Sequence, residues 1–108
     1  MVDRVTEADF DERVLGSSEP VLVDFYGDSC MPCKRLAPQL SKLEAAHAQA
    51  GDLAVVKVNT SFDSGLARRF AVMGTPTLVL FRDGKELDRL VGFQRLDQLE
   101  TFVKQSVA

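Results

Sequence analysis

The only two cysteines of the chain, Cys30 and Cys33, lie three positions apart directly after an apolar run. That run, Val21 to Tyr26, is typical of a buried strand, and the residues from Lys34 onward are typical of a helix. The first N–H groups of a helix lack backbone partners and favour a thiolate placed beside them. The sequence therefore predicts a dithiol that exchanges with other disulfides rather than one that holds a fold together.

A metal site is the main alternative for such a pair. A structural zinc ion takes about four ligands, whereas the chain offers two cysteines and one histidine. Only a bridge between two copies, each contributing Cys30 and Cys33, could supply four thiolates. We therefore favour redox exchange and expect no metal. His47 shares a helical face with Leu40 and Leu43, which indicates a packing role.

Two charged residues interrupt the apolar strands. Asp24 lies between Val23 and Phe25, and because burial raises the pKa of a carboxyl it is a candidate acid–base group. The alternative is a structural aspartate whose hydrogen bonds are satisfied, or one at a strand end that faces water. Lys57 interrupts a second apolar strand in the same way, and a solvated lysine at a sheet edge is its alternative interpretation.

Composition argues against several classes of function. The 13 basic and 16 acidic residues give a formal net charge of −3 without a basic block, which argues against nucleic acid as a partner. No apolar stretch approaches the ~20 residues needed to span a bilayer, so no membrane partner is expected. The first residues lack the layout of a signal peptide. In a reducing compartment two close cysteines favour catalysis, and we expect a cytoplasmic protein.

Periodicity and turn signals predict the elements that position these residues. Helices are expected after Thr6, from about Met31 to Ala50, around Asp63 to Ala71 and, with Leu96, Leu99, Val103 and Val107 on one face, at the C-terminus. Strands are expected at 21–26, 53–58, 77–81 and 85–91, the last two joined by a hairpin at Asp83-Gly84. With a short N-terminal edge strand the order is β-α-β-α-β-α-β-β-α. The pattern predicts one α/β domain over residues 1–108.

This order of elements, together with several short stretches, resembles thioredoxin over essentially the whole chain. The matching stretches are Val23-Asp24-Phe25-Tyr26, Cys30-Met31-Pro32-Cys33-Lys34, Ala37-Pro38, Lys57-Val58-Asn59, Gly74-Thr75-Pro76-Thr77 and Asp83-Gly84. Their combined spacing is highly specific, whereas a lone Cys-x-x-Cys would be a weak signal. The resemblance implies the thioredoxin fold, a mixed central β-sheet flanked by four α-helices, with a cis peptide bond before Pro76.

The resemblance also implies roles for the residues at the dithiol. Cys30 would attack a protein disulfide and Cys33 would resolve the mixed disulfide, which leaves a Cys30–Cys33 disulfide. Asp24 would lie beneath Cys33 and manage its proton, with the Lys57 amine nearby. A flavin- and NADPH-dependent thioredoxin reductase would recharge the pair. The chain, expected to be a monomer, would then bind no cofactor itself.

A substrate-docking surface around the dithiol is also implied by the resemblance. Its residues would be Ser29, Met31, Pro32, Gly74, Thr75, Pro76, Gly92 and Phe93. In the family the backbone of the residue before the proline, here Thr75, pairs with an extended substrate segment. Ser29 stands where the family has tryptophan, Met31 where it has glycine, and Phe93 where a small residue is usual. We expect these differences to leave the dithiol chemistry intact and to bear on the choice of substrate and reductase.

Two other functions remain open for such a chain. One is a disulfide oxidase or isomerase in an oxidising compartment, which a signal sequence and a high reduction potential would favour. The other is a non-catalytic subunit that binds a partner through the Pro76 loop, which activity surviving the loss of both cysteines would indicate.

Overall fold

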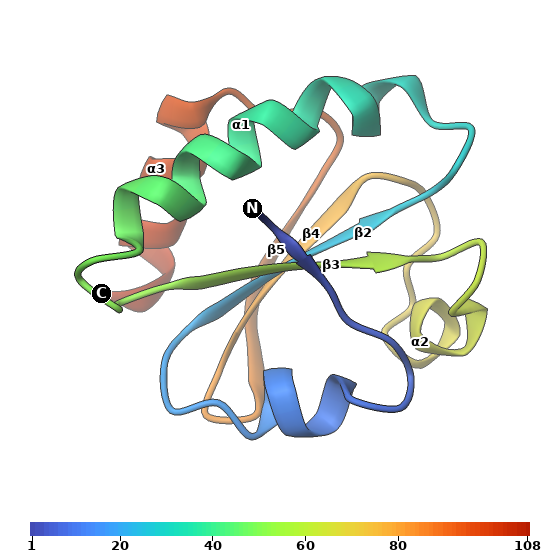
Figure 1. The fold of residues 1–108 in the computed structure, drawn as a ribbon, viewed down its shortest axis with the longest axis horizontal. Helices are drawn as coiled ribbons and strands as arrows, with labels where there is room; N and C mark the ends of the chain where they lie inside the picture. The colour runs from blue at the N-terminus through green and yellow to red at the C-terminus, as the bar shows by residue number, and fades with distance from the viewer.

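Five strands form one mixed sheet in the computed structural model, which describes all residues from Met1 to Ala108. The strands are β1 (Asp3–Arg4), β2 (Val21–Tyr26), β3 (Ala54–Asn59), β4 (Thr77–Arg82) and β5 (Lys85–Val91). They lie in the order β1-β3-β2-β4-β5, in which β3 runs parallel to β1 and β2 while β4 runs antiparallel to β2 and β5 (Figure 1). The predicted order of elements is confirmed, including the short N-terminal edge strand.

Helices cover both faces of this sheet. The helices α1 (Met31–His47) and α3 (Leu96–Val107) lie on one face, and α2 (Ser64–Arg69) lies on the other (Figure 1). A π-helical segment, η1 (Asp11–Leu15), lies on the same face of the sheet as α2. None of the helices is long and apolar enough to cross a membrane.

The first helical segment differs from the predicted α-helix. The Thr6 N–H donates to the Asp9 carboxylate at 2.7 Å, which is one half of a capping box. The regular segment nevertheless starts only at Asp11, where the Gly16 N–H donates to the Asp11 carbonyl at 2.8 Å. That five-residue spacing is the π-type hydrogen bond. The expectation of four α-helices is therefore wrong, because the structure has three α-helices and this π-helical segment.

Two further helices are shorter than predicted. α1 ends at His47 rather than Ala50, and one further turn follows it. Gly51 closes that turn with a φ of 63°, and its N–H donates to the His47 carbonyl at 3.0 Å. Such a left-handed residue after a helix closes its last turn. α2 begins at Ser64 rather than Asp63, whose carboxylate accepts from the Glu7 N–H and from Arg4.

Each face of the central strands packs into its own apolar core. Alternate β2 residues divide between the cores: Leu22 joins the cluster under α1 and α3, while Val23 and Phe25 join the cluster under η1 and α2. Successive strand residues point to opposite faces. Asp24 therefore faces α1, as does its register partner Lys57 on β3.

The hairpin between β4 and β5 turns at Asp83 and Gly84. Both residues have positive φ, 54° and 78°, as a two-residue type I′ turn requires. Because Asp-Gly is strongly preferred in that turn, the sequence predicted both the hairpin and the bounds of β5 correctly.

His47 ties the end of α1 to α3. Its Nδ1 lies 2.8 Å from the Asp52 carboxylate, and its Nε2 lies 2.7 Å from the Glu100 carboxylate. Neutral imidazole has one N–H, so both contacts are hydrogen bonds only when the ring is protonated. The hydrogen bond to Glu100, followed by that to Asp52, raises the pKa of His47 above its usual value.

We predict that His47→Gln is destabilising in acid and nearly neutral in base. A raised folded-state pKa stabilises the protein fully below the unfolded value near 6.5, and that contribution is lost as pH rises through the folded pKa. Urea unfolding of the oxidised proteins from pH 5 to pH 9 should show a gap of about 0.5–1.5 kcal/mol at the acid end. The gap should close toward pH 9; a gap that is constant or grows with pH contradicts this account. In a Glu100→Gln background the same substitution should have a smaller effect in acid.

Candidate active site: a dithiol above a buried carboxyl

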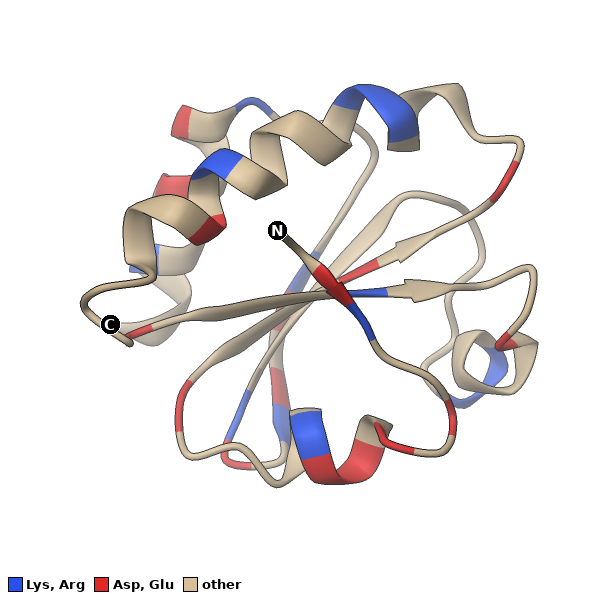
Figure 2. Ribbon diagram, viewed as in Figure 1, with Lys and Arg blue, Asp and Glu red and all other residues tan.

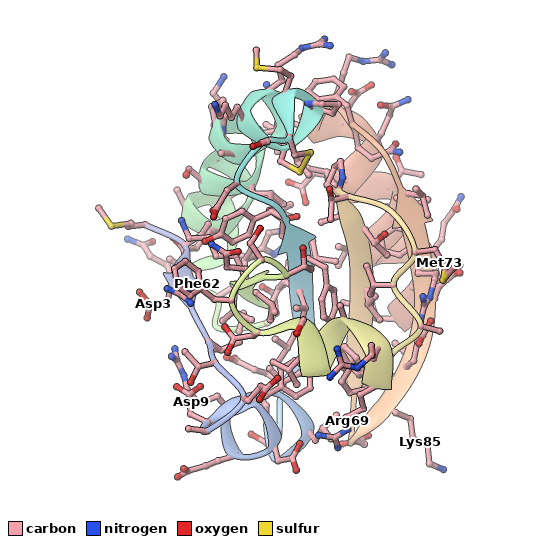
Figure 3. All side chains as sticks on the ribbon, turned by 90° about the vertical axis from the view of Figure 1, so that its right-hand side faces the viewer. Asp3, Asp9, Phe62, Arg69, Met73 and Lys85 are labelled. Atoms are coloured by element: carbon pink, nitrogen blue, oxygen red, sulfur yellow. A yellow bond between two sulfur atoms is a disulfide. The ribbon has the colours of Figure 1, made fainter.

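The dithiol begins α1. Cys30 is the N-cap residue, with an extended backbone, and its Sγ accepts from the Cys33 N–H at 3.2 Å. The two sulfurs form a disulfide with the Cα atoms 5.2 Å apart (Figure 3). Pro32 fits in the first turn because its missing N–H would have no partner there. In the reduced protein, a thiolate on Cys30 would be stabilised by the same N–H and by the helix dipole.

The two cysteines differ in access to solvent. Cys33 is only 5% exposed and lies against the core, whereas Cys30 is half-buried and its neighbours Ser29, Met31 and Pro32 are exposed. A substrate disulfide can therefore approach the sulfur of Cys30 more readily than that of Cys33.

A loop with a cis proline lies against Cys30. The Thr75–Pro76 bond is cis, as the resemblance implies, and the Thr75 carbonyl oxygen lies 3.5 Å from Cys30 Sγ. The Thr75 N–H has no partner within the chain, while the Pro76 carbonyl accepts from the Gly92 N–H at 2.8 Å. The loop thus presents free main-chain groups beside the dithiol, which is what addition of a substrate strand requires.

The turn that carries the dithiol is fastened to the loop after β3. The Tyr26 carbonyl accepts from the Thr60 N–H at 2.8 Å and from its hydroxyl at 2.9 Å. The Asn59 amide donates to the Asp28 carboxylate at 2.9 Å. These bonds fix the end of β2, so that Cys30 keeps its place beside the Thr75 carbonyl.

Asp24 lies beneath the dithiol without a full set of partners. The residue is 4% exposed and its Oδ1 forms no hydrogen bond. Burial raises the pKa of this carboxyl from 3.8 to about 7, and the charge of Lys57 opposes that rise. A carboxyl with that pKa exchanges protons readily at neutral pH.

A cavity of about 210 Å³ joins Asp24 to the second cysteine. Its walls include Asp24, Cys33 and Lys57, and the rest are Tyr26, Gly27, Asp28, Lys34 and Ala37. A cavity of this size that is lined by charged side chains has room for water. The sequence did not single out Tyr26 or Asp28, although both follow Asp24 on the strand and the turn that lead to the dithiol.

Lys57 is half-buried rather than fully solvated. Its backbone is paired with that of Asp24 across β2 and β3, and its amine lies 5.5 Å from the centre of the Tyr26 ring. The structure thus brings Lys57 to the Asp24 cavity.

The predicted docking residues are flanked by three side chains that the sequence did not indicate, those of Met73, Val91 and Arg35. Met31 is 65% exposed, and Met73 and Val91, directly before Gly74 and Gly92, are 95% and 66% exposed. Met73 lies at the surface of the molecule (Figure 3). Phe93 is half-buried against the α1–α3 core. Arg35 lies over the Phe93 ring, with its guanidinium carbon 4.6 Å from the ring centre. The only sequence signal for Met73 and Val91 is that each directly precedes a predicted docking residue.

An accessible cysteine at a helix start, a second cysteine buried behind it and an adjacent cis-proline loop define a dithiol–disulfide oxidoreductase. The thioredoxin family model matches residues 1–105. A thioredoxin of Mycobacterium bovis is 46% identical over 89 residues, which cover 82% of this chain and 75% of that protein. Thioredoxin 1 of Synechococcus elongatus is 42% identical over 88 residues, covering 82% of this chain and 80% of that one.

A mitochondrial thioredoxin of Mus musculus is 38% identical over 99 residues, which cover 92% of this chain and 58% of the mouse protein. The chain therefore belongs to the thioredoxin family. Its fold is the thioredoxin fold, and its activity is the reduction of protein disulfides by a Cys-x-x-Cys dithiol.

We predict that Asp24→Asn stabilises the oxidised protein increasingly as pH rises. A folded-state pKa raised from 3.8 to about 7 means that ionisation destabilises the fold above the unfolded pKa, and that this penalty levels off only above the folded one. The gain should be near zero at pH 4 and about 2–4 kcal/mol at pH 8. Asp88→Asn, at an exposed position, is the matched control and should show no such trend. Denaturant midpoints whose difference does not depend on pH would refute the burial argument.

Proposed function

We propose that Cys30 is the nucleophile and Cys33 the resolving cysteine of a protein-disulfide reductase. The Cys30 thiolate attacks one sulfur of the substrate disulfide, forming a mixed disulfide and releasing the other sulfur as a thiolate that takes up a proton. The Cys33 thiolate then attacks Cys30 Sγ, which releases the second substrate thiolate and forms the Cys30–Cys33 disulfide. The observation that carries this proposal is the difference in burial between the two sulfurs.

Asp24 is proposed to take the proton that Cys33 must lose in the second step. A buried thiol resists ionisation, so resolution at neutral pH needs a base that shares its cavity. Asp24 lines that cavity with Cys33, and its pKa of about 7 suits proton transfer in either direction. Lys57 is proposed to tune Asp24, since its charge lowers the pKa of the carboxyl.

The substrate is proposed to bind as an added strand at Thr75. Main-chain hydrogen bonds to Thr75 would supply affinity, while Ser29, Met31, Pro32 and Phe93 contact the flanking side chains. The loops at Gly74–Pro76 and Gly92 would complete this docking surface. Methionine is unbranched and adaptable, so Met31 suits substrates of varied shape.

Electrons are proposed to come from a thioredoxin reductase, itself flavin- and NADPH-dependent. The chain would then bind no cofactor of its own and would act as a monomeric carrier. A cytoplasmic location is proposed because cysteine pairs of this kind are catalytic in reducing compartments.

Turnover of a generic protein disulfide, such as insulin, with and without a thioredoxin reductase and NADPH tests the function directly. We expect sustained reduction only when the chain, the reductase and NADPH are all present. Activity that survives Cys30→Ser combined with Cys33→Ser would instead indicate a non-catalytic partner-binding role. Oxidation of reduced substrates in preference to reduction of oxidised ones would indicate an oxidase or isomerase.

We predict that Cys33→Ser accumulates a mixed disulfide through Cys30, whereas Cys30→Ser does not. Without Cys33 the first step proceeds and the resolving step cannot. Mass spectrometry of non-reduced samples after incubation with a disulfide substrate measures the adducts. Equal adduct on the remaining cysteine of both variants would show that the assigned roles are wrong.

We predict a reduction potential below about −200 mV. Isomerases and stronger oxidants have potentials above that limit. Met31 and Pro32 bring no charge and no side-chain hydrogen-bond donor that would stabilise a thiolate on Cys30. Equilibration with glutathione measures the potential, and a value above that limit would exclude the reductase direction. Ser29→Trp should change the rate of recharging by a thioredoxin reductase more than it changes this potential, because it enlarges the docking surface without adding charge near Cys30.

A further inference from the structure

Arg35 is the one arginine of the chain that forms no hydrogen bond or ion pair. Every other arginine donates to an oxygen of a side chain or of the backbone. The exposed guanidinium of Arg35 instead lies over the Phe93 ring, with its central carbon 4.6 Å from the ring centre. Stacking on an aromatic face leaves the N–H groups at the edge of a guanidinium free to donate.

The Phe93 ring is held in place beside the dithiol. Phe93 packs against the core under α1 and α3, and the preceding residue, Gly92, donates its N–H to the Pro76 carbonyl at 2.8 Å. The neighbouring Thr75 carbonyl lies 3.5 Å from Cys30 Sγ. Phe93 therefore holds Arg35 next to the Thr75–Pro76 loop, which is proposed to receive the substrate strand.

The charge around the dithiol contrasts with that of the chain. The formal net charge is −3, yet the first turns of α1 carry Lys34 and Arg35 (Figure 2). The nearby Arg95 is paired with Asp97, whereas the exposed Asp28 keeps its negative charge because its hydrogen bond comes from the neutral amide of Asn59. Lys34 and Arg35 outnumber this one carboxylate, so the balance of exposed charge beside the dithiol is positive and complementary to an acidic partner.

We propose that Arg35, stacked on Phe93, binds the carboxylate of an aspartate or glutamate close in sequence to the substrate cystine. The protein then prefers protein disulfides with acidic neighbours. A guanidinium binds a carboxylate through two parallel N–H···O bonds. The stack on Phe93 holds the guanidinium in one orientation, with these N–H groups free to donate. This inference rests on the proposed function, in which Cys30 attacks a disulfide on this surface.

The test compares two disulfide-linked peptides that are identical except for glutamate or glutamine two and three residues from each cysteine. Pre-reduced protein is mixed with each peptide in a single turnover, so that no reductase takes part. Each rate constant is divided by the rate constant for the same peptide with dithiothreitol, which removes the effect of the acids on the disulfide itself. For the wild type we expect the glutamate peptide to be about three- to fivefold faster at low salt. In 0.5 M NaCl the preference should shrink, because salt screens exposed charges.

Variants distinguish the effect of the stacked guanidinium on the rate ratio from the effect of positive charge in general. Arg35→Gln should bring the ratio of the two rates close to one, and Arg35→Lys should leave an intermediate ratio, because an ammonium keeps the charge without the fork. Phe93→Leu, which removes the ring and keeps an apolar side chain, should also lower the ratio. Lys42→Gln is the matched control: it removes a positive charge from an exposed position two turns further along α1 and should retain the wild-type ratio.

The outcomes distinguish this inference from the function on which it rests. Failure of the wild-type protein to reduce either peptide would contradict the proposed function. Reduction of both peptides at equal normalised rates would leave the function intact and overturn the role of Arg35. An equal loss of preference in Lys42→Gln and Arg35→Gln would also overturn it, since overall charge would then explain the preference.

Discussion

The carboxyl of Asp24 lies in the central strand of the sheet, 4% exposed and with one oxygen that forms no hydrogen bond. A buried polar group without a full set of partners destabilises a fold, and an ionised one does so far more. The rest of the domain has to offset this penalty. It does so with two apolar cores, one on each face of the sheet. Together these cores bury the residues of β2 around Asp24, which are Val21, Leu22, Val23 and Phe25.

The same buried position makes the dithiol useful. Because the carboxyl faces α1, it shares a cavity with Cys33, the cysteine that solvent reaches least. Burial raises the pKa of Asp24 to about 7, and the Lys57 charge prevents a larger rise. In the proposed mechanism, the destabilising carboxyl is therefore also the base beside Cys33, the thiol that ionises last. The same mechanism requires a Cys30 thiolate before the substrate binds, which the N-terminus of α1 would stabilise.

Much of this arrangement could be predicted from local sequence. The Cys-x-x-Cys turn, the two-sided burial of β2 and the Asp83-Gly84 hairpin are set by residues within a few positions of one another, so their signals are complete in the sequence. The raised pKa of Asp24 follows from its apolar neighbours. The sequence also indicated Lys57, although it could not choose between a solvated lysine and one beside Asp24, because that choice depends on the pairing of β3 with β2.

The features that escaped prediction depend on contacts between distant segments. The late start of α2 reflects a side chain engaged elsewhere, the Asp63 carboxylate that binds Arg4 and the Glu7 N–H. His47 was expected to pack, but its bridge to Glu100 joins residues 53 positions apart. The stack of Arg35 on Phe93 likewise depends on how α1 meets the loop after β5. No local pattern contains that information.

The central claim, that burial beside the dithiol raises the pKa of Asp24 into the neutral range, is tested most directly by titrating that carboxyl. The ¹³C chemical shift of the Asp24 side-chain carboxyl should be followed from pH 3 to pH 10 in the oxidised protein, in which no thiol titrates. The account predicts a midpoint near the value of about 7 that burial imposes. A midpoint near 4, the value of an exposed aspartate, would contradict it.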